Sequence, residues 1–253
     1  MYRVMALANQ TKHAFLISFS GIDGAGKSTQ IQALSAHLGE KGLRVDSVAF
    51  WDSVATLTRF RESAGYAIFN GDRGVGSPVA PIERRDKNVR SPLMTLARLC
   101  LYSFDAVSLR RIVRKASCSG ADVVLFDRYL YDELANLPLQ YRFIRIWCRL
   151  LLAFVPRPHV ALLLDANPEQ ARARKPEYPL DFLLLNRQAY LALAQLEPCI
   201  KVIAPMQVDA VQRDILEVTL TRLSIPTSPT ATPDSRNDKA RAAVDSAHPR
   251  PAS

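Results

Sequence analysis

A glycine-rich loop limits the folds that are open to this chain. Residues 21–29 have the sequence GIDGAGKST, which contains the complete pattern G-x-x-x-x-G-K-S. An apolar run at 15–19 precedes the loop, and residues 30–38 follow it with apolar side chains at helical spacing. A strand, such a loop and a helix in this order form a phosphate-binding P-loop. The motif therefore predicts an α/β protein that binds a nucleoside triphosphate.

Each part of this loop is matched to a part of the nucleotide. Glycines allow the backbone amides to turn toward phosphate oxygens, and the start of the following helix adds partial positive charge. Lys27 is predicted to neutralise the β- and γ-phosphates as a catalytic residue, and Ser28 to bind Mg²⁺. The predicted ATP-binding residues are Gly21, Asp23, Gly24, Ala25, Gly26, Lys27, Ser28 and Thr29.

A second motif, Asp127-Arg128-Tyr129, ends the apolar segment 122–127. A continuous apolar run with an acid at its end is typical of a buried parallel strand. Asp127 is predicted to hold Mg²⁺ opposite the P-loop, directly or through water. The planar guanidinium of Arg128 is suited to a substrate phosphate. The motif is short, so it is also compatible with Asp127 capping a helix and Arg128 being a surface residue.

The rest of the chain alternates between strand-like and helix-like segments. Strands are predicted at 15–20, 44–50, 122–127, 159–165 and 201–204, and helices at 29–41, 93–115, 138–155, 168–174, 180–196 and 208–223. This order predicts a three-layer α/β/α sandwich with a central parallel sheet of about five strands, which binds its ligands at the carboxyl ends of the strands. We expect a flexible N-terminus at 1–13, one domain at 14–224 with an irregular insertion at 65–92, and a disordered tail at 225–253.

Charge and composition restrict the partners. The formal net charge is +9, but no aromatic RNA-binding signature, zinc finger or basic repeat accompanies it. We therefore expect a small anionic substrate rather than nucleic acid. Arginines and prolines interrupt the apolar stretch 143–166, which excludes a membrane span there. The N-terminus has no secretory segment, and the four cysteines are far apart, so we expect a cytoplasmic protein without disulfides or a zinc site.

The two motifs together resemble thymidylate kinase. The resemblance is carried by residues 20–30 and by Asp127-Arg128-Tyr129, and it continues more weakly through 161–169 and 187–191. It implies a P-loop kinase fold over 15–223, a lid region at about 168–182, and a homodimer. The implied reaction is the phosphorylation of dTMP to dTDP with ATP and Mg²⁺.

The resemblance also implies roles for single residues. Asp23 matches the carboxylate near the substrate sugar hydroxyl, and Arg128 matches the arginine that brings the acceptor and donor phosphates together. Gly24 stands where some members carry an arginine, and members without it use arginines of the lid. Arg172 and Arg174 are the predicted catalytic lid residues, with Lys175 as a further candidate. Alternatively, these are solvated helix charges.

Two departures from the family lie on the acceptor side. The family has Arg-Glu-Pro after its second strand, whereas this chain has Phe50-Trp51-Asp52-Ser53. The family also has a phenylalanine and, four residues later, an arginine that grips the base. Tyr102 keeps the aromatic ring, but Ala106 replaces the cation. Candidates to replace the missing cations are Arg59, Arg61, Arg84, Arg85, Lys87 and Arg90.

Asp52 opens a different interpretation of the acceptor. Kinases that phosphorylate a hydroxyl use a carboxylate to take its proton, whereas a monophosphate is already ionised. Asp52 is therefore either such a base or the N-cap of a helix that starts at Ser53. Three functions stay open: a nucleoside monophosphate kinase acting on dTMP, a kinase of a nucleoside or other small alcohol, and a non-catalytic nucleotide-binding protein. The predicted substrate-binding residues are Asp23, Asp52, Arg59, Tyr102 and Arg128.

Overall fold

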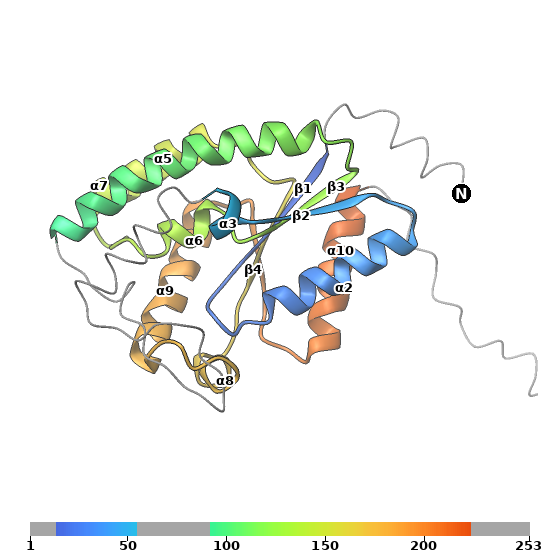
Figure 1. The fold of residues 1–253 in the computed structure, drawn as a ribbon. Coiled ribbons are helices and arrows are strands. Elements are labelled where there is room, and N and C mark those ends of the chain that lie inside the picture. The colour runs from blue at the N-terminus through green and yellow to red at the C-terminus, as the bar shows by residue number, and fades with distance from the viewer. Residues whose placement is uncertain (1–13, 55–91, 224–253) are drawn as a thin grey trace, which may run out of the picture.

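A parallel β-sheet forms the centre of the structure, which is a computed structural model (Figure 1). The structure describes residues 14–54 and 92–223, and within them the sheet has five strands in the order β2-β3-β1-β4-β5. Neighbouring strands pair in parallel throughout. The strands are β1 (Phe15–Ser20), β2 (Val45–Ala49), β3 (Val123–Asp127), β4 (Val160–Leu164) and β5 (Ile200–Ile203).

Helices cover both faces of this sheet. Figure 1 shows α2 (Lys27–Glu40) and α10 (Val208–Leu223) on one side of the strands. The other side is covered by α5 (Pro92–Ser117), α6 (Leu130–Leu134), α7 (Arg142–Phe154) and α9 (Leu180–Leu196). Two short helices, α3 (Phe50–Ser53) and α8 (Pro168–Arg174), follow the carboxyl ends of β2 and β4. The predicted three-layer α/β/α P-loop kinase fold is therefore confirmed.

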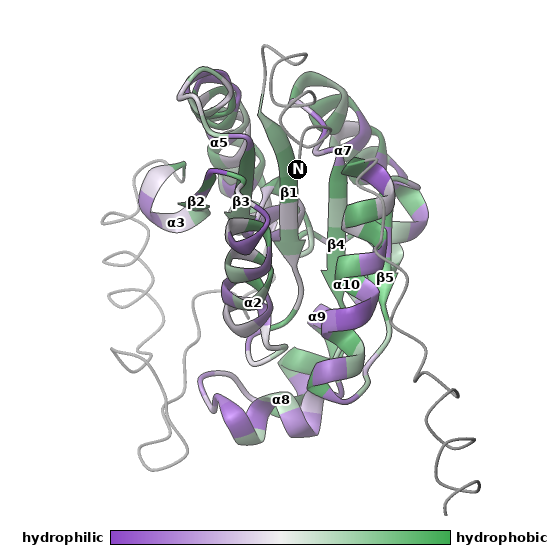
Figure 2. Cartoon of the chain, turned by 90° about the vertical axis from the view of Figure 1, so that its right-hand side faces the viewer, coloured by the Kyte–Doolittle hydropathy of each residue, from purple (hydrophilic) through white to green (hydrophobic). Residues whose placement is uncertain are grey.

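Two apolar cores lie on the two faces of the sheet. Ile17 and Val123 belong to the core under α2 and α10, whereas Leu16 and Val124 belong to the core under the other helices. This division follows from the strand geometry, because successive side chains point to opposite faces. A strand buried on both faces has to be apolar at every position, which is why β3 and β4 are continuous apolar runs. Figure 2 shows this hydrophobic character along β1, β3 and β4.

The predicted elements differ from the observed ones mainly at short helices and at boundaries. Neither α3 nor α6 was predicted, because four or five residues are too few to show helical periodicity. The helix predicted at 138–155 begins only at Arg142, since residues after Pro138 form turns. No helix in the described part of the chain is long and apolar enough to cross a membrane.

Several predicted features lie outside the described residues. They are the N-terminal segment 1–13, the insertion 65–92 apart from Pro92, the tail 225–253, and the basic residues Arg59, Arg61, Arg84, Arg85, Lys87 and Arg90.

Candidate active site

The P-loop connects β1 to α2 at the carboxyl edge of the sheet. Gly26 is the N-cap residue of α2 and has a φ of 90°, and Gly24 has a φ of 83°. Both values lie in the left-handed region that glycine adopts without steric cost. Glycine is therefore favoured at both positions, of which Gly26 is fixed in the motif and Gly24 is at one of its variable positions. The helix begins at Lys27, two residues before the predicted start, because Gly26 ends the loop.

Lys27 is held against this loop by backbone carbonyls. Its Nζ donates to the oxygen of Gly21 at 2.8 Å and to that of Ile22 at 3.0 Å. Burial, and to a lesser extent the nearby Arg128, lower the pKa of Lys27 from its ordinary value to about 8, although three carboxylates oppose both effects. The free protein therefore keeps this ammonium in a position where its charge is costly, and an added anion would stabilise the charged form.

Asp127 and Arg128 lie beside the P-loop because β3 pairs with β1. Phe19 is opposite Asp127 in the register, and the backbone amide of Arg128 donates to the oxygen of Phe19 at 2.9 Å. The predicted metal ligands are thus on neighbouring elements, with Asp127 at the end of β3 and Ser28 in the first turn of α2. Their carboxylate and hydroxyl oxygens are the donor type that Mg²⁺ prefers, and Mg²⁺ takes few ligands from a protein. The residues present fit a magnesium ion.

The Arg128 guanidinium lies between two carboxylates. Its Nη2 contacts Asp23 Oδ1 of the P-loop, and its Nη1 is 3.6 Å from Asp132 Oδ1. The three side chains are 15%, 11% and 2% exposed, so solvent screens these interactions weakly. Burial disfavours the charge on Arg128, but Asp23 and Asp132 outweigh it and raise its pKa well above the ordinary value. The interpretation of Arg128 as an exposed surface residue is therefore wrong.

The helix α8, which lies in the predicted lid region, packs directly against the P-loop. The Nε of Arg174 donates to the backbone oxygen of Gly24 at 2.9 Å, whereas the Nε of Arg172 donates to the oxygen of Tyr178, a few residues further along the chain, at 3.3 Å. A Cβ atom on Gly24 would lie 2.2 Å from the backbone oxygen of Ala171 in α8. The sequence left Arg172 and Arg174 unranked, and of these two it is Arg174 that bonds to the P-loop.

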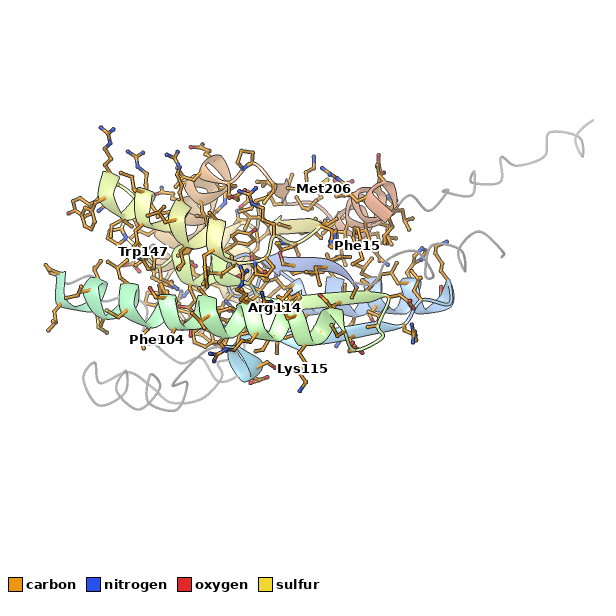
Figure 3. All side chains as sticks on the ribbon, turned by 90° about the horizontal axis from the view of Figure 1, so that it is seen from above. Phe15, Phe104, Arg114, Lys115, Trp147 and Met206 are labelled. Carbon is orange, nitrogen blue, oxygen red and sulfur yellow. The ribbon has the colours of Figure 1, made fainter. Side chains whose placement is uncertain are left out.

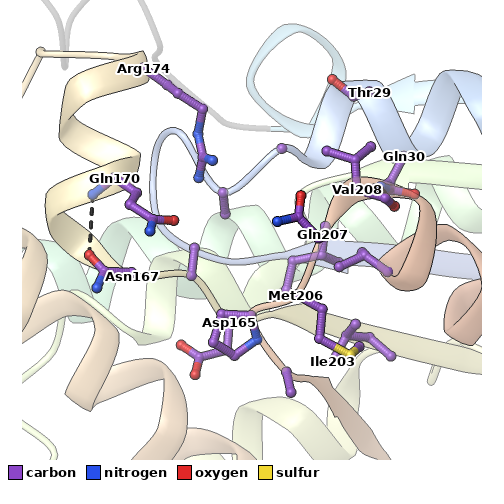
Figure 4. Close-up of a pocket in the computed structure, with 17 residues that line it drawn as sticks. Thr29, Gln30, Asp165, Asn167, Gln170, Arg174, Ile203, Met206, Gln207 and Val208 are labelled. Atoms are coloured by element: carbon purple, nitrogen blue, oxygen red, sulfur yellow. Dashed lines mark hydrogen bonds between the residues drawn. The ribbon is translucent and has the colours of Figure 1, made fainter.

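A cavity of about 560 Å³ opens beside the P-loop (Figure 4). Gly26 and Thr29 of the loop, Arg174 of α8, and Met206 and Val208 before and at the start of α10 are among its lining residues. Its volume is suited to a nucleotide base and sugar. Sequence reasoning missed the residues after β5, because no motif marks them. The one signal that could have found them is the rule that ligands bind at the carboxyl ends of parallel strands, because this segment follows β5.

Tyr102 lies buried on α5 with 4% of its surface exposed. Arg98, one helical turn earlier, is 7% exposed, and its Nη1 donates to the backbone oxygen of Asn136 at 3.4 Å. Sequence reasoning missed Arg98, because it looked for a cation four residues after Tyr102 and found Ala106. Residues four positions apart in either direction share a helix face. A cation therefore does accompany Tyr102 on α5.

Asp52 is exposed in α3, directly after β2. That helix begins at Phe50, and its N-cap is Ala49. The interpretation of Asp52 as the N-cap of a helix starting at Ser53 is therefore wrong. Register places Ala49 opposite Asp127, so Asp52 lies just beyond the sheet edge that carries the P-loop. Its role as a general base stays a prediction.

Replacing Gly24 by alanine tests the contact between α8 and the P-loop. Gly24→Ala is expected to lower the free energy of unfolding by about 1–3 kcal/mol more than Gly42→Ala, because a rigid backbone oxygen would obstruct the new methyl group. Gly42 is a matched control, since its φ is 81° and nothing lies within 4 Å of an added Cβ. Urea unfolding measures both values. Equal losses would mean that α8 does not pack on the loop in solution.

Known proteins are similar to this chain over most of its length. No model of a protein family matches the sequence. The thymidylate kinase of Symbiobacterium thermophilum is 30% identical over 218 residues, which are 79% of this chain and 89% of that protein. The chain belongs to the thymidylate kinase family. It is accordingly a phosphotransferase of the nucleoside monophosphate kinase type, and the resemblance seen in the two motifs is confirmed.

Two further similarities agree with this membership. The probable thymidylate kinase of Methanothermobacter thermautotrophicus is 29% identical over 207 residues, or 80% of this chain and 92% of that protein. The solved structure of thymidylate kinase from Candida albicans has a TM-score of 0.56 at 18% identity, and the match covers 85% of this chain and 96% of that chain. At this identity the solved structure supports the family's fold alone.

Proposed function

We propose that this protein transfers the γ-phosphate of ATP to dTMP and forms dTDP in the presence of Mg²⁺. The observation that carries the proposal is the convergence of three cations on one loop. Lys27 and Arg174 both donate to backbone oxygens of the P-loop, and Arg128 contacts its carboxylate Asp23. The names of the curated relatives support dTMP as the acceptor.

The donor half of the reaction uses the loop and the lid. Lys27 would bind the β- and γ-phosphates, and Arg174 would approach the γ-phosphate from α8. The cavity beyond Thr29 would accept the base and sugar of the donor. Ser28 and Asp127 would hold Mg²⁺, which neutralises charge on the phosphate oxygens when bound. Phosphoryl transfer spreads negative charge over oxygens, so cations held in place lower the barrier.

The acceptor half requires positioning rather than proton removal. A monophosphate is already ionised at neutral pH and needs no base to attack. Asp23 would accept a hydrogen bond from the sugar hydroxyl, and Arg128 would bind the acceptor phosphate next to the transferred group. Tyr102 would contact the base. Holding donor and acceptor in line contributes several kcal/mol to the barrier reduction, because the entropy of orientation is lost on binding.

A kinase of a nucleoside or another small alcohol is the second candidate. It is favoured by the exposed carboxylate of Asp52 at the same sheet edge as Asp127. In that reaction Asp52 would take the proton of the attacking hydroxyl. Arg128 would then have no acceptor phosphate to bind and would serve the transferred phosphoryl group only.

A screen of ATP consumption over nucleoside monophosphates, nucleosides and sugars separates these functions. Turnover of dTMP well above every other acceptor supports the main proposal. Turnover of an uncharged alcohol alone, lost in Asp52→Asn, supports the second candidate. ATP binding without turnover of any acceptor would leave a non-catalytic nucleotide-binding protein.

The lowered pKa of Lys27 predicts that ATP binding takes up a proton. At pH 8.5 a group with a pKa of about 8 is mostly neutral in the free protein. Bound phosphates favour its charged form, so the complex should take up roughly 0.7 proton. ATP affinity should accordingly fall as pH rises through and above 8. Calorimetry in two buffers of different ionisation enthalpy measures this uptake. Lys27→Arg, which is always charged, should take up none, and an equal uptake in that variant would contradict the assignment.

We further propose that the protein is a homodimer, as the family resemblance implies. The support is a set of exposed apolar side chains on α5 and α7, among them Phe104, which Figure 3 labels on α5. The two helices are joined by a hydrogen bond of 2.6 Å from Arg110 Nη1 to the backbone oxygen of Phe154. These exposed apolar side chains include Phe104, Phe143, Ile146 and Leu150, with exposures of 62%, 61%, 48% and 67%. Large apolar side chains exposed on two adjoining helices are typical of a protein interface.

Leu150→Asp tests this interface. The charge is expected to convert the dimer into a monomer, because a buried unpaired carboxylate is costly. Light scattering coupled to size exclusion measures the mass. Leu184→Asp, on the exposed part of α9, is the control and should keep the wild-type mass. A wild-type protein that is monomeric at micromolar concentration would contradict the proposal.

A further inference from the structure

Asp132 joins three distant parts of the chain at one buried carboxylate. Its Oδ2 accepts hydrogen bonds from Ser20 Oγ at 2.6 Å and from the Tyr129 amide at 3.0 Å. Its Oδ1 accepts one from Tyr190 Oη at 2.8 Å. Ser20 ends β1, Tyr129 caps α6, and Tyr190 lies in α9. Asp132 itself is 4% exposed.

Capping α6 does not explain why this residue is charged. The bond from the Tyr129 amide uses one carboxylate oxygen only, and an uncharged asparagine at this position would offer an oxygen of the same reach. Burying a carboxylate costs several kcal/mol unless a cation and hydrogen bonds compensate it. The compensating cation is Arg128, whose Nη1 lies 3.6 Å from the second oxygen. The charge of Asp132 therefore acts on Arg128.

Arg128 follows β3 with an uncommon backbone conformation, and two carboxylates hold its side chain. Its φ is 72°, and it is the one residue besides glycine with a positive φ in the described segments 14–54 and 92–223. Asp23 contacts Nη2 and Asp132 approaches Nη1, so the two carboxylates hold two different nitrogens of the planar guanidinium. Contacts to two nitrogens restrict rotation of the group, whereas a single contact leaves it free to swing.

We propose that Asp132 is a positioning residue, which orients the Arg128 guanidinium toward the acceptor phosphate and is itself held by Ser20 and Tyr190. The role of Arg128 at the acceptor rests on the proposed function. The orientation of Arg128 by Asp132 does not, so the two are tested separately.

The orientation is tested first by NMR of the arginine guanidinium groups in the full chain, without any substrate. The Arg128 signals are assigned by their loss in Arg128→Lys. In the wild-type protein, separate Nη signals are expected, because rotation about the Nε–Cζ bond is slow. In Asp132→Asn, which keeps an oxygen that can accept from the Tyr129 amide, and in Asp132→Ser, these signals should merge. Merged signals in the wild-type protein, or separate signals in either folded variant, would overturn the proposal.

A double-mutant cycle with dTMP then tests the effect on the reaction. Asp132→Asn is expected to lower kcat/KM for the acceptor about tenfold and to change the KM for ATP less than about twofold. In the Arg128→Ala background the same change should cost less than about twofold, because the group it positions is absent. Equal losses in both backgrounds would show that Asp132 does not act through Arg128. A wild-type protein inactive on dTMP would refute the proposed function, while the NMR result would still decide the orientation.

Asp122→Asn is the matched control for both experiments. It removes a carboxylate from the pair with Arg44, whose Nε is 3.2 Å from Asp122 Oδ2 and whose side chain is 71% exposed. The Arg128 signals and the acceptor kinetics should stay at wild-type values in this variant. A purely structural role of Asp132 would lower the melting temperature and leave the Arg128 signals and the cycle unchanged.

Discussion

Lys27→Ala is expected to lower kcat by about a hundredfold or more. The ammonium donates to two carbonyls of the P-loop, so it is already placed where the β- and γ-phosphates of the donor would lie. Alanine removes the charge and leaves the loop backbone, whose shape depends on the glycines. Initial rates of ADP formation at saturating ATP and acceptor measure the effect.

A control separates the loss of this charge from a general loss of positive charge. Lys115 is exposed near the end of α5, and Lys115→Ala should keep kcat within about twofold of the wild type. Circular dichroism should show both variants folded, because an alanine is favourable in a helix. Near-normal turnover in Lys27→Ala would count heavily against a P-loop kinase.

Arg128→Ala is expected to lower kcat/KM for the acceptor about a hundredfold, with a change in the KM for ATP of less than about threefold. Arg128 is held by Asp23 and Asp132, and none of these three residues lines the cavity that is proposed to accept the base and sugar of ATP. Steady-state kinetics with one substrate varied at a time separate the two effects.

This substitution also carries a cost in stability, which the experiment must take into account. Removing the guanidinium leaves two carboxylates with little exposure and no cation between them, so a loss of about 3 kcal/mol is expected. Rates are therefore compared well below the unfolding transition. Arg128→Lys keeps the charge and loses the planar fork, so it should recover stability more than acceptor use. A larger effect on ATP than on the acceptor would show that the acceptor side has been misassigned.

Both variants address the same cluster of charges. Lys27 and Arg128 are cations, and Asp23, Asp127 and Asp132 all raise the pKa of Lys27. The carboxylates thus stabilise the two cations in the free protein. Donor and acceptor phosphates bring further negative charge to these cations when they bind. The pKa of Lys27 is the most direct measure of this balance.

Agreement between sequence and structure was best where the information is local. The P-loop was recognisable because a tight turn around phosphate requires glycine at fixed positions and a lysine at the helix start. The buried strands β3 and β4 were recognisable because both of their faces are apolar. Short helices such as α3 and α6 escaped prediction, since helical periodicity needs more than one turn.

The composition of the site was predictable only in part. Asp127 and Arg128 could be proposed from their place after a buried strand. Asp132 is five residues after Asp127, and the sequence carries no signal of its role. Its partners Ser20 and Tyr190 are 112 and 58 residues away along the chain. Arg98 was missed because the family's spacing directed the search to the position four residues after Tyr102. The residue four positions before Tyr102 lies on the same face of the helix.

The amino-acid sequence alone determined the fold class, the phosphate-binding loop and its lysine, because local backbone geometry and periodic burial decide them. Only the tertiary structure decided which charges meet. The pairing of β1 with β3 brings Arg128 to the loop, the packing of α8 on Gly24 places Arg174 ahead of Arg172, and the approach of α6 and α9 surrounds Asp132. These contacts join residues far apart in the chain, and such contacts depend on how whole elements pack rather than on any local pattern.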